Sequence, residues 1–304
     1  MISGLLVLDK PAGPTSHDAV DRVRRALGER RVGHAGTLDP FATGVLPVCV
    51  GQATRLVRFL SDADKEYEAE VRLGFATTTD DATGEALGPP RPVDVAAERL
   101  AEACRSLTGR LDQVPPAFSA KRQGGKRHYE LARRGVAVER RPVPVTVHEL
   151  ELVERNGDRL RFRVRCSRGT YVRALARDLG ARVGAGAHLT ALRRTRVGHL
   201  GLERAVDWEQ PETWARELLP NEAALTPSLP RARVVSEAGA QAVRHGRPLD
   251  RSLVESGFPD IAEGPVALVD AAGRLLGVAE PVGFDPAPGL PPHPHLQPRV
   301  VLGE

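Results

Sequence analysis

The order of apolar and polar residues is typical of strands in three parts of the chain. Residues 4–9 form a short apolar run, which predicts a buried strand near the start of the sequence. In residues 67–73 the apolar side chains occupy every second position and charged ones lie between them, and residues 160–166 repeat this pattern with arginines between the apolar positions. Strict alternation predicts two half-buried strands here.

After each of these predicted strands, apolar residues recur at the three- and four-residue spacing of an amphipathic helix. This spacing predicts helices from Thr15 or Ser16 to Leu27, over 95–108, and after the turn Ser167–Thr170. Strands and helices mix without regular β-α-β alternation, so a mixed α/β (α+β) fold is expected rather than a doubly wound sheet. Beyond Pro230 the short apolar runs 266–269, 275–278 and 300–302 predict a small, mostly β domain over 231–304, which leaves 1–230 as the first domain.

Composition narrows the class of protein. The 304 residues are 41% hydrophobic and 27% charged, the balance of a soluble globular protein, and no apolar run reaches the length of a membrane span. The first residues lack the basic stretch of a secretory signal, so a cytoplasmic location is expected. The three cysteines lie far apart and predict reduced, buried thiols. No phosphate-binding glycine loop, dinucleotide fingerprint or histidine metal motif is present, and we expect neither cofactor nor metal.

The basic residues are concentrated in two segments. Of the 43 basic residues 39 are arginines, and residues 121–143 and 154–177 each hold eight basic side chains against two acids. Guanidinium groups pair well with phosphates, so the two segments indicate a polyanionic partner. Solvated basic faces are the alternative explanation.

Asp39 stands in an unusual segment, bracketed by Gly36, Pro40 and Gly44 and followed by the apolar run 45–50. No basic residue lies between His34 and Arg55. A carboxylate on a glycine-supported loop can act as a catalytic group. It can equally be a turn or cap residue before proline, as Asp-Pro often is.

A resemblance to a known family favours the catalytic interpretation. The stretch from His34 to Leu46 resembles the catalytic motif of the TruB family of tRNA pseudouridine synthases. Four further blocks resemble that family in the same order: Gly4–Ser16, Lys65–Tyr67, Pro115–Lys121 and Arg168–Arg173. The resemblance covers roughly residues 3–230. It implies the pseudouridine synthase fold, with a central, mostly antiparallel sheet flanked by helices and loops, and a small PUA-like RNA-binding domain at the C-terminus.

The resemblance also implies a reaction and roles for particular residues. Uridine-55 in the T loop of tRNA would be detached from its ribose and rejoined through C5, which needs a nucleophile but no redox partner. The family's aspartate falls on Asp39, the cation that holds it ionised on Arg173, and the tyrosine that stacks on the target base on Tyr67. Tyr171 and Leu192 match residues that line the same pocket.

Further residues are expected to bind the RNA. The target base must leave its stack before a side chain can reach it, and His34 matches the family residue that fills the vacated space. Residues 113–144 resemble the family's basic thumb-like insertion. The predicted phosphate or substrate contacts are Lys10, Lys121, Arg122, Lys126, Arg127, Arg193, Arg194 and Arg196.

The expected partner is a tRNA T stem-loop, bound by a monomer that needs no other protein. Two other functions remain open at this point. The first is a guide-RNA-dependent synthase that modifies ribosomal RNA and requires partner proteins. The second is a non-catalytic tRNA-folding chaperone that binds tRNA in the same groove as the enzyme would. An aspartate-nucleophile glycosidase is disfavoured because no second carboxylate motif supplies its acid.

Overall fold

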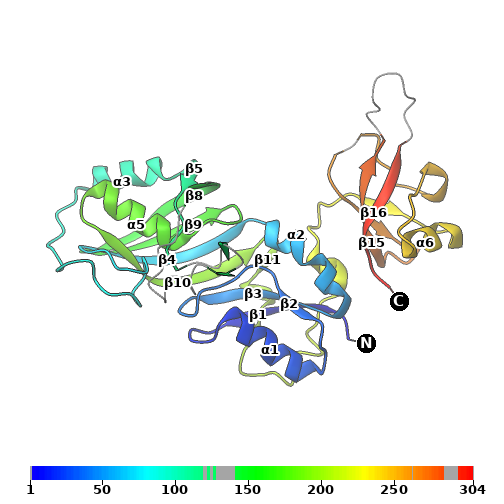
Figure 1. Ribbon diagram of the computed structural model, residues 1–304, viewed down its shortest axis with the longest axis horizontal. Helices are drawn as coiled ribbons and strands as arrows, with labels where there is room; N and C mark the ends of the chain where they lie inside the picture. Colours follow the sequence, from blue (N-terminus) through cyan, green and yellow to red (C-terminus); the bar gives the residue numbers. More distant parts are fainter. Residues whose placement is uncertain are drawn as a thin grey trace.

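The structure is a computed structural model that describes residues 2–118, 122–123, 126–127, 141–261, 263–283 and 294–303, with the backbone alone for 122–123 and 126–127. Figure 1 shows a large sheet with its helices and, beside it, a smaller β unit near the C-terminus. In the part of the chain that is described, no helix is long and apolar enough to cross a membrane.

The elements of the large unit are β1 (Gly4–Lys10), α1 (Ser16–Leu27), β2 (Val32–His34), β3 (Thr43–Val50), η1 (Gly51–Leu56), α2 (Val57–Asp62), β4 (Lys65–Leu73), α3 (Ala97–Ser106), β5 (Gly109–Gln113), β6 (Arg122–Gln123), β7 (Lys126–Arg127), β8 (Val143–Asn156), β9 (Arg159–Cys166), α5 (Val172–Val183), β10 (Ala187–Val197), β11 (Leu200–Gly201), η2 (Leu202–Arg204), β12 (Val206–Asp207) and η3 (Asn221–Ala224). Those of the smaller unit are β13 (Arg231–Arg233), α6 (Glu237–Arg244), η4 (Arg251–Leu253), β14 (Val266–Val269), β15 (Leu275–Val282) and β16 (His295–Val301).

The large sheet joins two halves through β10. Its order is β12-β1-β3-β10-β4-β9-β8-β5, with β2 paired to β3 and β11 to β10. Neighbours run antiparallel except for β1 with β12 and β3 with β10. The second sheet has the order β13-β14-β15-β16. The mixed, mostly antiparallel architecture expected from the sequence is thereby confirmed, while the predicted domain boundary at residue 230 stays a prediction.

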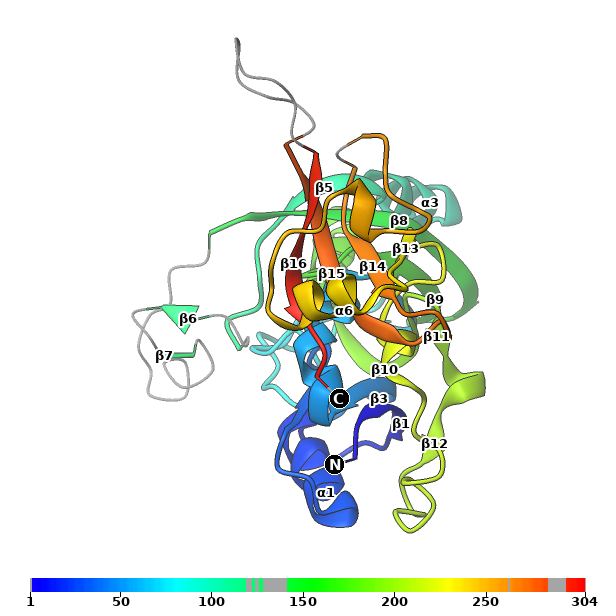
Figure 2. The ribbon, with the colours of Figure 1, turned by 90° about the vertical axis from the view of Figure 1, so that its right-hand side faces the viewer.

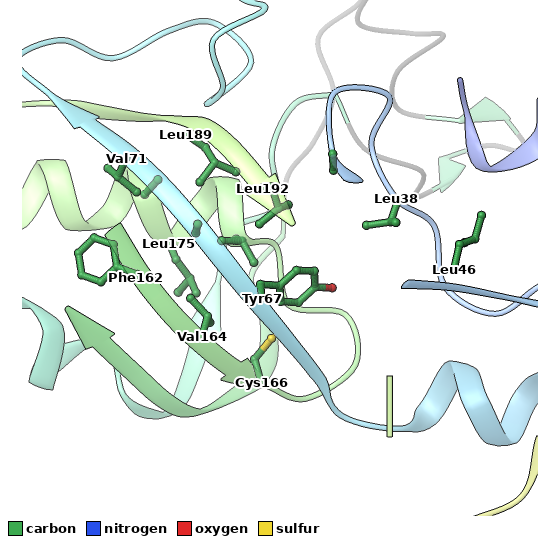
Figure 3. Close-up of a cluster of buried hydrophobic side chains, with 14 of the residues drawn as sticks. Leu38, Leu46, Tyr67, Val71, Phe162, Val164, Cys166, Leu175, Leu189 and Leu192 are labelled. Atoms are coloured by element: carbon green, nitrogen blue, oxygen red, sulfur yellow. The ribbon is translucent and has the colours of Figure 1, made fainter. Parts of the chain in front are cut away.

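One face of β4 and β9 forms the core under α5. Tyr67, Val71, Phe162 and Val164 alternate inward and pack with Leu175 of the helix, as Figure 3 shows. Burying an apolar side chain of this size contributes roughly 2 kcal/mol. The two segments with alternating apolar residues are therefore strands, as predicted. Their inward side chains pack against α5 and hold it on the sheet.

The other face of the same strands is a ladder of opposite charges. Arg161, Arg163 and Arg165 of β9 each stand between a glutamate of β4 and a glutamate of β8 in the sheet register. Ion pairs form between Arg161 and Glu154 and between Arg163 and Glu151, at 3.2 and 3.7 Å. Three of the eight arginines of segment 154–177 thus face acids of the neighbouring strands, while its indication of a polyanionic partner stays a prediction.

Helix α1 begins and ends where its sequence predicts. The Thr15 side chain accepts a hydrogen bond from the Asp18 backbone N–H, and the Asp18 carboxylate accepts one from Thr15 in return. Gly28 closes the helix in the left-handed conformation. By contrast, α5 begins at Tyr171 without a side-chain cap of its own.

The three thiols are free and buried, as expected. Burial raises the pKa of Cys49 and of Cys166 to about 12, so both remain protonated and unreactive at neutral pH.

The smaller unit is fixed to the large one by an apolar cluster and a polar clamp. Val7 and Leu56 belong to the same buried cluster as Val269 and Val300. The Gln52 side chain donates to the Gly303 carbonyl at 2.8 Å and accepts from the Gly303 N–H at 2.6 Å. One buried cluster therefore contains side chains of both units, and the smaller unit has a second cluster of its own.

The predicted insertion leaves the sheet and returns to it at one pair of residues. Gln113, the last residue of β5, pairs with Val143, the first residue of β8. Between them the short strands β6 and β7 pair with each other and lie apart from the main body in Figure 2. Lys121 lies outside the described residues, as do the side chains of Arg122, Lys126 and Arg127.

Candidate active site

The loop that carries Asp39 connects β2 to β3 and is held by the segment that follows β1. The Ser16 hydroxyl accepts from the Leu38 N–H at 2.8 Å and donates to the Leu38 carbonyl at 3.1 Å. The Gly13 N–H donates to the Pro40 carbonyl at 2.8 Å. Two sequence blocks that are separate in the chain thus form one structure, with Asp39 between two anchored residues.

Two buried cations support the same loop. Lys10 is fully buried, and its ammonium donates to the carbonyls of Pro11, Pro14 and Pro40. Burial lowers its pKa to about 8. Arg194 is 1% exposed and donates to the carbonyls of Val45 and Gly36 at 2.7 and 3.0 Å. Both were predicted to contact substrate, and their burial corrects this, because donors bound to backbone carbonyls inside the protein do not reach a phosphate.

Asp39 and Arg173 form a close pair at the centre of the site. Arg173 Nε lies 2.9 Å from Asp39 Oδ2, and Arg173 Nη2 donates to Asp39 Oδ1 at 3.1 Å. The Arg173 side chain is 5% exposed, whereas a third of the Asp39 side chain is open to solvent. The carboxylate is therefore accessible to a ligand while the guanidinium behind it is not.

Arg173 is itself held from three other directions. Its Nη1 lies 3.3 Å from the Asp81 carboxylate and donates to the Thr79 carbonyl at 3.0 Å. Its Nη2 donates to the Phe118 carbonyl at 2.9 Å. Asp81 accepts hydrogen bonds from the hydroxyls of Thr79 and Thr83. Three segments that are distant from one another in the chain fix this one side chain.

Asp81 was not among the predicted site residues, although the loop that carries it, residues 74–84, resembles a threonine- and aspartate-rich loop of the TruB family. Periodicity gives no signal for them, because the loop is irregular and meets Arg173 only through the fold. The threonines around Asp81 were the available clue, since short hydroxyl side chains near a carboxylate satisfy its lone pairs.

Burial raises the pKa of the Asp39 carboxyl above its ordinary value, and the nearby Asp81 charge adds to this. The Arg173 guanidinium opposes both effects. A partly exposed carboxylate with a perturbed pKa and a fixed cation beside it is typical of a catalytic group.

Tyr67 lies beside this pair on the inner face of β4. In Figure 3 its ring stands between Leu192 and Cys166, with the hydroxyl directed toward Leu38. Burial raises the pKa of the phenol, so it is neutral at neutral pH, and the charge of the nearby Arg194 opposes this rise. The structure thus brings Tyr67 and Leu192 to the Asp39 loop.

The remaining predicted residues lie around this centre. Tyr171 is half-buried and stands directly before α5, two residues from Arg173. His34 is half-buried at the end of β2, at the start of the Asp39 loop. Arg193 is partly exposed and pairs with Asp9 at 2.6 Å. Arg196 lies 3.6 Å from Glu66, so it too has an acidic partner.

Comparison with known proteins points to one family. Residues 24–172 match the N-terminal domain of the TruB family pseudouridylate synthases, and residues 173–228 match the tRNA pseudouridylate synthase B C-terminal domain. The tRNA pseudouridine synthase B of Thermobifida fusca is 47% identical over 291 residues, covering 92% of this chain and 95% of that protein. The protein of the same name from Azoarcus sp. is 43% identical over 284 residues, covering 92% and 91%.

Solved structures show the same fold at lower identity. An H/ACA RNP bound to a substrate RNA containing 2'-deoxyuridine contains a chain that is 25% identical, with a TM-score of 0.73, covering 99% of this chain and 85% of that one. A Cbf5-Nop10-Gar1 complex contains one that is 27% identical, with a TM-score of 0.72, covering 98% and 84%. The structure brings Asp39, Arg173 and Tyr67 together in one site, and the family models and relatives match most of the sequence. The chain belongs to the TruB family of pseudouridylate synthases.

Proposed function

We propose that this chain converts uridine-55 in the T loop of tRNA to pseudouridine, with Asp39 as the nucleophile. In this isomerisation the N1–C1′ bond breaks, a C5–C1′ bond forms, the proton on C5 is lost and N1 gains a proton. The single observation that carries the proposal is the Asp39 carboxylate, partly exposed and paired with the buried Arg173 at 2.9 Å. A carboxylate held in this way suits covalent catalysis at a sugar or base carbon.

The groups around Asp39 have complementary roles in the proposal. Arg173 keeps the carboxylate ionised and oriented, since four fixed partners prevent the guanidinium from turning away. Tyr67 offers a neutral aromatic face on which the flipped base stacks, and Leu192 closes the apolar side of the pocket.

In the proposal two kinds of residue contact the RNA: one that fills the space left by the flipped base, and several that bind phosphates. His34 takes the place of the extruded base, and Tyr171 flanks the pocket beside it. Lys121, Arg122, Lys126 and Arg127 of the insertion, with Arg193, grip the backbone. Arg193 supports this because its ion pair with Asp9 leaves it partly exposed on β10, opposite the first residue of β3.

A guide-dependent synthase is the second candidate, because the similar solved structures are an H/ACA RNP and a Cbf5-Nop10-Gar1 complex, in which the matching chain has partners. The relatives with the higher identity are named tRNA pseudouridine synthase B and match over more than nine-tenths of both chains. This favours tRNA as the substrate. We therefore propose a cytoplasmic enzyme that acts as a monomer without guide RNA or partner protein.

A single-turnover assay tests the proposal. An unmodified T-arm hairpin carrying tritium at C5 of its uridines is mixed with excess protein, and tritium release reports loss of the C5 proton. We expect the wild type to release tritium from one uridine, and Asp39→Asn to bind the hairpin normally but react roughly 10⁴-fold more slowly or not at all. Asp260→Asn, a change at an exposed aspartate of the smaller unit, is the matched control.

The outcomes separate the candidates. Tritium release from a hairpin in which uridine-55 has been replaced by cytidine would contradict the uridine-55 assignment. Binding without release by the wild type would favour a folding chaperone. Release that starts only when a guide RNA and partner proteins are added would favour the guide-dependent enzyme.

A further inference from the structure

The buried Gln113 side chain makes a two-point contact with the backbone of Tyr171. Its Oε1 accepts from the Tyr171 N–H at 2.8 Å, and its Nε2 donates to the Tyr171 carbonyl at 3.1 Å. The side chain is 3% exposed, so both bonds are shielded from water. An amide that satisfies both polar groups of one residue fixes that residue in position and orientation.

The residue fixed in this way begins the helix that carries the catalytic arginine. Tyr171 is the N-cap of α5 but supplies no side-chain cap, and Arg173 lies in the first helical turn. Helix ends fray when their polar groups are unsatisfied. Gln113 therefore supplies from another strand the restraint that the start of α5 lacks.

The residues that follow Gln113 contact α5 at two more places. The Val114 carbonyl accepts from Arg177 at 2.9 Å, and the Phe118 carbonyl accepts from Arg173, also at 2.9 Å. Arg177 is in turn paired with the Asp80 carboxylate at 2.9 Å, next to Asp81. Residues 113–118 thus contact the cap, the first turn and the second turn of the helix.

These contacts lie where the insertion departs from the sheet, because Gln113 is the residue that pairs with Val143 at its base. Resting on the proposed function, we propose that Gln113 is a positioning residue for the reaction. It locks Tyr171 and the first turn of α5 so that Arg173 is aligned with the Asp39 carboxylate. It touches neither the reacting atoms nor the RNA.

Two substitutions at Gln113 test this. Gln113→Met keeps the length and apolar stem of the side chain but can neither donate nor accept these bonds. Gln113→Glu keeps the acceptor for the Tyr171 N–H and loses the amide donor. Gln241→Met, at an exposed glutamine on α6, is the matched control.

Single-turnover tritium release at saturating protein isolates the chemical step, and filter binding gives the hairpin Kd. The rate is normalised to the folded fraction from urea unfolding. Because a displacement of about 1 Å at a catalytic group can cost about 100-fold in rate, we expect Gln113→Met to lose about 10- to 100-fold. Gln113→Glu should lose less, the control should match the wild type, and all Kd values should agree within about threefold.

A rate within threefold of the wild type for folded Gln113→Met would overturn the proposal and leave Gln113 a purely structural residue. A loss of affinity that accounts for the whole effect would overturn it too, because Gln113 would then act in binding. In both cases the wild type still releases tritium, so the proposed function stands. If the wild type releases none, the proposed function fails and this inference fails with it.

Discussion

The Asp39 carboxylate is subject to opposing influences, and their sum has a consequence for the pH dependence of the reaction. Burial and the Asp81 charge raise its pKa above the ordinary value of 3.8, and Arg173 reduces the rise without cancelling it. The nucleophile must be ionised to react. We therefore expect the single-turnover rate to fall in acid with a midpoint above 3.8, because the group with the raised pKa takes up its proton earlier than an exposed aspartate would.

A pH–rate profile of the wild type, measured with bound hairpin, checks this expectation. Asp260→Asn should give the same profile. A rate that stays constant down to pH 4 would contradict the burial of the carboxylate in the working enzyme.

Among the site residues, those that we propose to carry the chemistry stand out in the sequence, whereas the residues that support them do not. Asp39, Tyr67 and Arg173 stand in sequence motifs, and the fold brings them together. Arg194 was assigned to the RNA, although it lies two positions after the inward-facing Leu192 and so shares its face of β10. Lys10 gave no comparable signal, because it ends a strand, where alternation no longer tells the side chain's direction.

At the scale of the element, the parallel pairing of β3 with β10 depends on one glycine. Gly44 has a φ of +101°, and a Cβ atom there would lie 2.1 Å from the Arg194 carbonyl oxygen. Gly28 has a φ of +63° but no atom near its Cβ position. We expect Gly44→Ala to lower the free energy of unfolding by about 3 kcal/mol or more and Gly28→Ala by only about 1 kcal/mol.

Urea unfolding of both variants measures this difference. The pair separates crowding from backbone strain, since both glycines have positive φ and only Gly44 is crowded. Equal losses would show that the strands separate to accept the new methyl group.

Regular strands were predictable and interrupted ones were not. β4 and β9 alternate without a break, so their inner faces follow from the sequence. β10 contains irregularities between Leu189 and Ala191 and between Arg194 and Arg196, where pairing with β4 shifts. A shift of one residue exchanges inward and outward positions. The alternation in β10 is therefore broken twice, and this central strand had no clear signature.

At the scale of the whole molecule, the fold decides which arginines are available to a polyanion. Arg163 stands between Glu68 and Glu151 in the charge ladder, whereas Arg122 was predicted to meet a phosphate. We expect Arg122→Ala to weaken hairpin binding and to lower the slope of log K against log salt by about one unit. Arg163→Ala should leave both nearly unchanged, because the neighbouring acids already cancel its charge.

Filter binding from low to moderate salt measures the two slopes. A reduced slope for Arg163→Ala would show that the ladder face contacts RNA. The charge count of the sequence could not make this distinction, because the acids that flank the β9 arginines come from β4 and β8, and one of those strands is about 90 residues away.

The place of β10 in the sheet also governs when the enzyme can form during synthesis. The strands on either side of it, β3 and β4, are complete by residue 73, but the strand that joins them ends at Val197. A ribosome that adds roughly 5–20 residues per second needs about ten seconds for that interval. During it Asp39 and Tyr67 belong to two unconnected sheet fragments with open edges. Until residue 197 has left the ribosome, the facing edges of β3 and β4 therefore lack the strand that pairs with both.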